Sequence, residues 1–492
     1  MKNIKLFQVI FVAAALTIPC ANTSAFKPVH PSKLVYKPIE LNPPVPEKTV
    51  LENGMVIYTL EDHELPLFNI NAVIKTGGIY VSEDMTGLAE MTGEVMRSGG
   101  AQSMSWEEID EKLEFIAGSV ETGIGSDSGT AHLSVLKKDI DEGLNIFADI
   151  LMNPVFDQEK VDLQNKQMIE SIRRENDNPG QVAGREFRRL LYGDHPYGRK
   201  VTIETVSRIN REDLMGFHQK YYHPNNVMLG ITGDFDKGEI LDKIKLVFKD
   251  WKIKDGGKRK VAYPLILLEN KEDDYPIVPR VKENLNKSIN YIHKDVKQSI
   301  IRLGHMGLDK KNPDHYAVIL MNYILGGGSF QSRMMKDIRS DRGLAYSVWS
   351  HFHLGYRDIG VFSSGAATKL SSTVTVIKRM QEIIQEMREH PVTEQELNEA
   401  KEYIINSFVF KFTSTSQIVN RFITLEYYGL PTNYLENYLE NIKKISSEDI
   451  LRVAKKYLKP DQTVVLVVGN KEKFEESLDV FGPVNEIKLK IQ

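Results

Sequence analysis

The chain has 492 residues, of which 41% are hydrophobic, so it is long enough for two or three domains with sizeable cores. Its 63 basic and 67 acidic residues give a net charge of −4. This near balance offers no electrostatic support for a protein that binds nucleic acid or an anionic surface.

Residues 1–25 are predicted to be a signal peptide. Lys2 and Lys5 precede an apolar run from Leu6 to Ile18, and small residues up to Ala25 provide a cleavage site. The run is too short to span a bilayer, and no other stretch is a candidate transmembrane segment. We therefore expect an exported protein, periplasmic if the source is bacterial.

The only cysteine, Cys20, lies inside this segment. Cleavage after Ala25 would leave a chain without thiols, which excludes disulfides, thiolate ligands and cysteine nucleophiles. The alternative is lipid attachment at Cys20, for which the preceding Pro19 is a poor fit.

The next segment, residues 26–47, contains six prolines and is predicted to form an extended arm. Strands are expected at Met55–Leu60 and Phe68–Lys75, each bounded by a glycine-containing turn. Helical patterns then alternate with short strands without a regular strand–helix–strand rhythm, which predicts an α+β domain over residues 48–251.

The second half of the chain repeats the first. Residues 191–234 align without a gap on residues 427–470, so that Tyr192 meets Tyr428 and Gly233 meets Gly469 at one constant offset. The sequence thus predicts a tandem duplication of one α+β domain, with a charged linker at 252–287 and a second domain at 288–492.

The stretch from Gly87 to Gly100 is predicted to be an amphipathic helix. Its apolar residues recur at helical spacing, and a pair of glycines ends it; the apolar residues are Leu88, Met91, Val95 and Met96. Glu90 and Glu94 are four residues apart and share another face. The simplest interpretation of that face is a solvated acidic edge in which Arg97 pairs with Glu94.

This helix and the residues after it resemble the N-terminal domain of the inverzincin peptidases, the family of pitrilysin, insulinase and the mitochondrial processing peptidases. Active members carry His-x-x-Glu-His in this helix. The resemblance places Glu90 and Glu94 at the two His positions and Gly93 at the position of the catalytic Glu, so all three motif residues are replaced. Glu170, in the segment KQMIESIRREND, lies close to the family's third ligand position.

These replacements argue against hydrolysis by this chain. Hydrolytic zinc sites combine imidazole with carboxylate, whereas carboxylates alone suit Mg²⁺, Ca²⁺ or Mn²⁺. Gly93 also has no side chain to accept a proton from water. We predict no catalytic residue and no metal in this chain, and interpret Glu90, Glu94 and Glu170 as remnants of a zinc site.

The second domain keeps a different part of the family pattern. The resemblance implies that Arg339 and Tyr346, seven residues apart, hold the main chain of a peptide substrate at the active site formed with the first domain. An Arg fork and a Tyr hydroxyl are suitable donors for a carbonyl or an oxyanion. The alternative is that Arg339 pairs with Asp337 or Asp341 at the surface and that Tyr346 only fills space in a strand.

Two classes of function follow from this asymmetry. The first is a non-catalytic, substrate-binding subunit of an exported heterodimeric zinc metallopeptidase, whose partner is a paralogue with an intact motif and the zinc. The second is a non-enzymatic peptide-binding protein or a structural assembly subunit. A stand-alone peptidase that uses Glu90, Glu94 and Glu170 with another metal is a third, weaker hypothesis, since Gly93 supplies no base.

Overall fold

A computed structural model describes residues 43–252, 276–431 and 433–489. The predicted signal peptide, Cys20, most of the proline-rich arm and most of the predicted linker lie outside these residues. No helix within the described ranges is long and apolar enough to cross a membrane.

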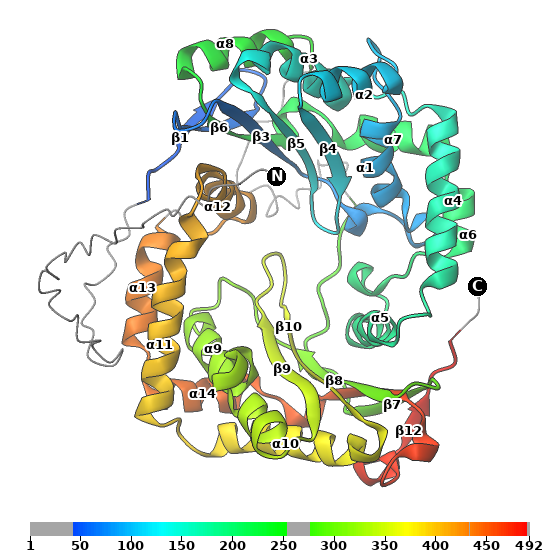
Figure 1. Ribbon diagram of the computed structural model, residues 1–492, viewed down its shortest axis with the longest axis vertical. Coiled ribbons are helices and arrows are strands. Elements are labelled where there is room, and N and C mark those ends of the chain that lie inside the picture. Colours follow the sequence, from blue (N-terminus) through cyan, green and yellow to red (C-terminus); the bar gives the residue numbers. More distant parts are fainter. Residues whose placement is uncertain (1–42, 253–275, 432, 490–492) are drawn as a thin grey trace, which may run out of the picture. The chain divides into compact units, whose positions relative to one another are not determined.

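The first half contains a six-stranded mixed sheet (Figure 1). Its strands lie in the order β1-β2-β6-β3-β5-β4, in which β2 and β6 are parallel and the other neighbours antiparallel. The bounds are β1 Glu47–Val50, β2 Val56–Glu61, β3 Leu67–Ile74, β4 Ser119–Ile124, β5 Gly129–Leu136 and β6 Val227–Gly233. The two strands expected from the sequence are confirmed as β2 and β3, each displaced by one residue.

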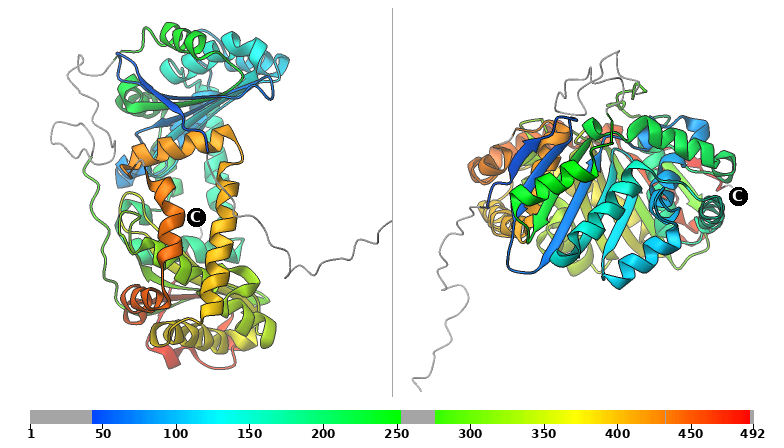
Figure 2. Two further views of the ribbon diagram at one scale, coloured as in Figure 1. Left: turned by 90° about the vertical axis from the view of Figure 1, so that its left-hand side faces the viewer. Right: turned by 90° about the horizontal axis from the view of Figure 1, so that it is seen from above.

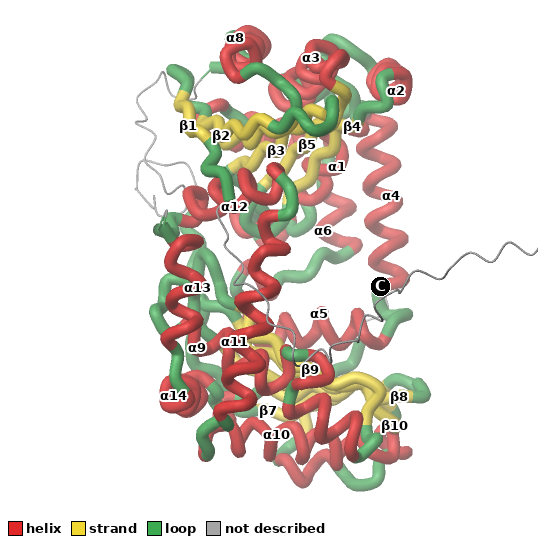
Figure 3. Tube along the Cα trace, turned by 60° about the vertical axis from the view of Figure 1, so that its left-hand side comes forward, coloured by secondary structure: helices red, strands yellow, loops and turns green. Residues whose placement is uncertain are grey.

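The described residues of the first half form eight α-helices. They are α1 Leu88–Ser98, α2 Trp106–Phe115, α3 Ile140–Met152, α4 Gln158–Arg174, α5 Pro179–Tyr192, α6 Ile203–Arg208, α7 Arg211–Tyr221 and α8 Lys237–Val247. Helix α3 lies over β5 and packs against α8. Figure 3 shows these two helices on one side of the sheet.

The second half repeats this sheet in the order β12-β7-β11-β8-β10-β9. The bounds are β7 Ser288–His293, β8 Gln298–Met306, β9 Ala345–His353, β10 Val361–Lys369, β11 Val464–Gly469 and β12 Val484–Glu486. The helices are α9 His315–Asn322, α10 Thr373–Glu389, α11 Glu394–Phe408, α12 Thr415–Tyr428, α13 Tyr434–Lys444 and α14 Ser447–Tyr457. Two π-helical segments, Tyr323–Gly327 and Met335–Asp341, lie between α9 and β9.

The predicted tandem duplication is confirmed, and in the two sheets only the edge strands β1 and β12 differ, because β1 pairs with β2 antiparallel whereas β12 follows β11 and pairs with β7 in parallel. The offset that aligns Tyr192 with Tyr428 carries α5 onto α12 and α7 onto α14 with identical bounds, and it carries β6 onto β11. The capping residues repeat as well, because Asn210 caps α7 and Ser446 caps α14 through the same reciprocal side-chain pattern. The fold is therefore two copies of one α+β domain.

The equivalent helices α5 and α12 are exchanged between the two halves. Helix α12, from the second half, packs on β2, β3 and β6 of the first sheet, while α5, from the first half, packs on β8 and β11 of the second (Figure 2). Each contact is an apolar cluster. Tyr58 and Met228 meet Val419 and Ile423 in one cluster; the other includes Val182, Ala183, Phe187, Leu191, Ile292, Met306, Val464, Leu466 and Val468.

The two exchanged contacts differ in how they fill the same space. On the first sheet, a β carbon at Gly230 would lie 2.6 Å from Val419 Cγ1 and 2.8 Å from Ile423 Cδ1. On the second sheet, the equivalent position is Leu466, and the residue equivalent to Val419 is the smaller Ala183. At this pair of positions, a large residue on one partner is combined with a small residue on the other in both clusters. The matching does not extend to Ile423, whose equivalent is the larger Phe187.

We expect Gly230→Leu to destabilise the protein by about 1–3 kcal/mol, because the added side chain overlaps α12. Adding Val419→Ala reproduces the pairing found on the second sheet and should recover part of the loss. Urea unfolding of the two single variants and of the double variant measures the coupling. Strictly additive effects would contradict the proposed complementarity.

Candidate functional site

Helix α1 buries the stripe predicted from its sequence. Met91, Val95 and Met96 are fully buried, while Glu90 and Glu94 are exposed on another face of the helix. The predicted helix over residues 87–100 is confirmed at Leu88–Ser98, with Gly99 as its C-cap.

Gly93 lies where α1 comes closest to strand β4. A β carbon built on Gly93 would stand 2.4 Å from the backbone nitrogen of Ile124 and 2.7 Å from the carbonyl carbon of Gly123. Thr122 Oγ1 donates a hydrogen bond of 2.6 Å to the Gly93 carbonyl oxygen at the same contact. The strand backbone therefore occupies the space that any side chain at position 93 would need.

Arg97 does not pair with Glu94, so that part of the solvated-edge interpretation is wrong. Its Nη2 lies 2.6 Å from Asp110 Oδ1 on α2, and its Nε donates to the carbonyl oxygen of Val120 on β4 at 3.1 Å. Helical spacing brings Arg97 near Glu94, but the carboxylate and carbonyl on neighbouring elements provide better acceptors for its planar fork. Arg97 thus helps to fix α1 against β4.

Glu90 and Glu94 are close enough to influence each other. Partial desolvation by the surrounding protein, and secondarily the negative charge of Glu94, raise the pKa of the Glu90 carboxyl above its usual value. No cation among the described residues offsets this effect by forming an ion pair with Glu90. Negative charge is therefore disfavoured at Glu90.

Glu170 is held by its own helix. Its two carboxylate oxygens lie 3.4 Å from Arg173 Nη1 and 3.1 Å from Arg174 Nε, one turn further along α4. In the parts of the chain that the structure describes, no group of three His, Cys, Asp or Glu residues is arranged to hold a metal ion. Two exposed carboxylates without imidazole, and a third tied to arginines, do not fit a hydrolytic zinc ion.

Arg339 lies in the second half, within the π-helical segment Met335–Asp341. Its guanidinium carbon stands 4.9 Å from the ring centre of Phe330 and 5.5 Å from that of Tyr346, and its Nη1 lies 4.0 Å from Met335 Sδ. Both rings are largely exposed, Phe330 at 61% and Tyr346 at 73%. The structure therefore brings a half-buried Arg339 and an exposed Tyr346 together.

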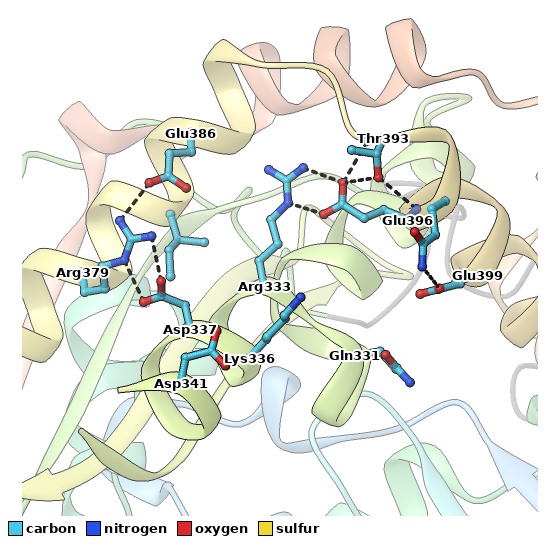
Figure 4. Close-up of a pocket in the computed structure, with 12 residues that line it drawn as sticks. Gln331, Arg333, Lys336, Asp337, Asp341, Arg379, Glu386, Thr393, Glu396 and Glu399 are labelled. Atoms are coloured by element: carbon cyan, nitrogen blue, oxygen red, sulfur yellow. Dashed lines mark hydrogen bonds and ion pairs between the residues drawn. The ribbon is translucent and has the colours of Figure 1, made fainter. Parts of the chain in front are cut away.

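The alternative pairing of Arg339 with Asp337 or Asp341 is not found. Asp337 accepts two hydrogen bonds from Arg379, at 2.8 and 3.0 Å (Figure 4). It accepts a third from Arg342 at 3.0 Å. Among the described residues, no carboxylate forms an ion pair with Arg339. Asp337 is already paired with Arg379 and Arg342, so it does not neutralise Arg339.

Comparison with known proteins shows the family of the chain. The profile described as insulinase (peptidase family M16) matches residues 56–204, and the profile described as the peptidase M16 inactive domain matches residues 208–404. The chain belongs to peptidase family M16. It is a member that lacks the active motif, since its sequence contains no His-x-x-Glu-His.

Similar proteins carry names of two kinds, zinc protease and non-peptidase homolog. A Rickettsia felis protein named as an uncharacterized zinc protease is 25% identical over 427 residues, which cover 85% of this chain and 97% of the relative. A Helicobacter pylori protein named as a non-peptidase homolog is 25% identical over 422 residues, or 85% of this chain and 92% of the relative.

Solved structures agree on the M16 fold. The peptidase M16 inactive domain from Pseudomonas fluorescens has a TM-score of 0.76 and 25% identity, covering 87% of this chain and 98% of that chain. A protease from Helicobacter pylori, with a TM-score of 0.75 and 18% identity, covers 87% of this chain and all of that one, and supports the fold alone.

Sequence reasoning missed Phe330, which is the second aromatic ring in contact with the Arg339 guanidinium. The available signal was a phenylalanine next to the glycine run at residues 326–328, in a turn where Ser329 adopts a positive φ of 50°. It also missed the steric role of Gly93, which only the position of β4 reveals. The resemblance gives position 93 to the catalytic Glu of the family. In this M16 chain, helix α1 packs so closely on strand β4 that no side chain fits at that position.

We expect Gly93→Ala to lower the melting temperature, because overpacking against backbone costs about 1–3 kcal/mol. Gly216→Ala is the matched control, since Gly216 is an exposed residue of α7 whose β carbon would meet nothing within 4 Å. It should stabilise the protein by about 0.4–1 kcal/mol. Thermal unfolding of both variants checks the difference in sign, and equal shifts would contradict the close contact.

We expect Glu90→Gln to raise the melting temperature slightly at pH 7. A carboxyl whose pKa is raised on folding destabilises the folded state above that pKa, and the effect disappears as the pH falls below the unfolded-state value near 4.5. The gain should therefore vanish at about pH 4. Melting curves at both pH values measure this gain, and the exposed Glu402→Gln is the control variant. A gain for Glu90→Gln that does not depend on pH would contradict this explanation.

Proposed function

We propose that this chain is the non-catalytic, substrate-binding subunit of an exported heterodimeric zinc peptidase. The observation that carries the proposal is the contrast between its two halves. At the zinc-motif helix, Gly93 leaves neither a base nor room for one, whereas a half-buried Arg339 and an exposed Tyr346 lie together in the second half.

The chemistry of the second site suits a peptide main chain. Arg339 carries a rigid set of N–H donors, and the flanking rings of Phe330 and Tyr346 keep its guanidinium oriented without neutralising its charge. The Tyr346 hydroxyl adds one more donor. Such a group can hold a substrate carbonyl, or stabilise an oxyanion that forms at an active site completed by a second chain.

The partner must supply what this chain lacks. A zinc ion with imidazole ligands and a glutamate base would come from a paralogue with an intact His-x-x-Glu-His motif, and the substrate would be a peptide or an unfolded polypeptide. Export is proposed from the predicted signal peptide over residues 1–25.

The test is to assay peptide cleavage by the purified mature chain, alone and mixed with such a paralogue from the same genome. We expect no cleavage by this chain alone and a clear gain of activity on mixing. In the mixture, Arg339→Ala should lower kcat/KM by roughly 10²-fold, as removal of an oxyanion donor commonly does, and Tyr346→Phe by roughly tenfold.

Arg342→Ala is the matched control, because Arg342 lies three residues from Arg339 but pairs with Asp337. Its rate should stay close to that of the unaltered mixture. Unchanged rates for both Arg339→Ala and Tyr346→Phe would overturn the roles proposed for these residues.

A non-enzymatic role is the second candidate, favoured by the Helicobacter pylori relative named as a non-peptidase homolog. In that case the chain would bind peptides, or support an assembly, without stimulating any paralogue. Peptide binding that persists when mixing produces no cleavage would favour this function over the heterodimer.

A further inference from the structure

Three basic side chains lie within one cluster of aromatic residues in the second half. Lys310 precedes α9, Lys411 lies in the short 3-10 turn Val409–Phe412 after α11, and Arg421 lies on α12. All three are half-buried. Helices α9, α11 and α13 pack on one another here (Figure 1), and the turn after α11 contacts α12.

Lys310 is held at one end of this cluster. The backbone nitrogen of Lys310 donates to the carbonyl oxygen of Gly355 at 2.8 Å, which ties its loop to the β9–β10 hairpin. Its Nζ donates to the Tyr356 hydroxyl at 2.6 Å. The same ammonium group stands 4.3 Å from the ring centre of Tyr356 and 5.4 Å from that of Tyr434.

Lys411 stands on the next rings. Its Nζ lies 5.2 Å from the ring centre of Phe408 and 5.1 Å from that of Tyr438. The rings of Tyr434 and Tyr438, under the two lysines, have centres 6.1 Å apart. Arg421 lies on α12, which contacts the turn that carries Lys411. Burial raises the pKa of both tyrosines, and the positive charge of Arg421 opposes this rise.

The three cations are not balanced by acidic groups. Within the described ranges, no Asp or Glu forms an ion pair with Lys310, Lys411 or Arg421. Burial, followed by repulsion from Arg421 and Lys310, lowers the pKa of Lys411 to about 8. A half-buried cation without a counter-ion is unfavourable, so this cluster reduces the stability of the protein unless something else balances its charge.

Two other half-buried basic groups of the same half have acidic partners. Arg333 makes two contacts with Glu396, at 2.6 and 2.9 Å, and Arg379 makes two with Asp337 (Figure 4). Arg302 and Arg339 are half-buried without an acidic partner among the residues that the structure describes, but each lies apart from this cluster. What distinguishes Lys310, Lys411 and Arg421 is that three such cations belong to one cluster. Such uncompensated charge is typical of a binding site for the opposite charge.

We propose that Lys310, Lys411 and Arg421 bind the carboxylates of an acidic peptide segment. Side chains at every second residue of an extended peptide lie on one face. An acidic segment can therefore present more than one carboxylate to the cluster, and the surrounding tyrosines offer apolar faces to the intervening chain. The inference rests on the proposed function only in calling this peptide a substrate.

The test uses the full mature chain without any partner. Binding is measured by fluorescence anisotropy with two labelled peptides of the same length, one with Glu and the other with Gln at alternate positions. We expect the Glu peptide to bind at least tenfold more tightly, and more weakly as salt is raised. Lys411→Met and Arg421→Gln should each weaken that binding roughly tenfold or more, whereas the exposed Lys455→Met should not.

Melting temperatures without peptide separate a binding role from a structural one. Lys411→Met keeps the aliphatic stem over the rings but removes the repelled charge, so we expect an unchanged or higher melting temperature together with lost binding. Lower melting temperatures for both Lys411→Met and Arg421→Gln, with unchanged peptide affinity, would overturn the proposal and make the cluster structural.

Inorganic phosphate is the control ligand for a compact oxyanion. We expect phosphate to compete weakly, because the ammonium groups of Lys310 and Lys411 stand over different rings and a compact ion does not match them. Phosphate binding that is tighter than that of the Glu peptide would overturn the assignment to a peptide. Failure of the chain to stimulate a zinc-bearing paralogue, with Glu-selective binding intact, would contradict the proposed heterodimer but leave this inference standing.

Discussion

The exchange of α5 and α12 between the two halves is the contact on which the rest of the structure depends. Each sheet has an apolar face that its own half leaves uncovered, and the helix that covers it comes from the other copy of the domain. Neither half can therefore bury its hydrophobic surface alone, and the gain from burial is available only when both are folded. The two halves thus act as one cooperative unit, although the sequence repeats like two independent domains.

The two candidate sites lie in different parts of the repeated domain. In the first half, α1 lies so close to β4 that the strand backbone fills the space beside Gly93, and Arg97 and Thr122 fasten the two elements together. The second half repeats this close packing, because a β carbon at Gly326 would lie 2.5 Å from the backbone nitrogen of Ser350 on β9. Arg339 belongs to the next segment, Met335–Asp341, which presents it beside two exposed rings.

Sequence reasoning succeeded where periodicity and spacing decide the outcome. The helix at residues 87–100, the strands β2 and β3 and the duplication follow from local patterns and from an alignment without gaps. It failed where the answer depends on which distant element arrives. Arg97 has Glu94 at the right spacing, yet Asp110 on another helix forms the ion pair. Lys310, Lys411 and Arg421 come from separate parts of the second half, and no local pattern joins them.

The exchanged helices also bear on how such a chain can vary. Two identical protomers related by a twofold axis must carry the same residue at both copies of every contact, so a cavity or an overlap in one is doubled in the other. Covalent fusion of the two copies removes this restriction. Gly230 facing Val419, against Leu466 facing Ala183, is a combination that a symmetric dimer could not have. In the joined chain, residues at one of the two equivalent contacts can therefore change while the residues at the other contact stay the same.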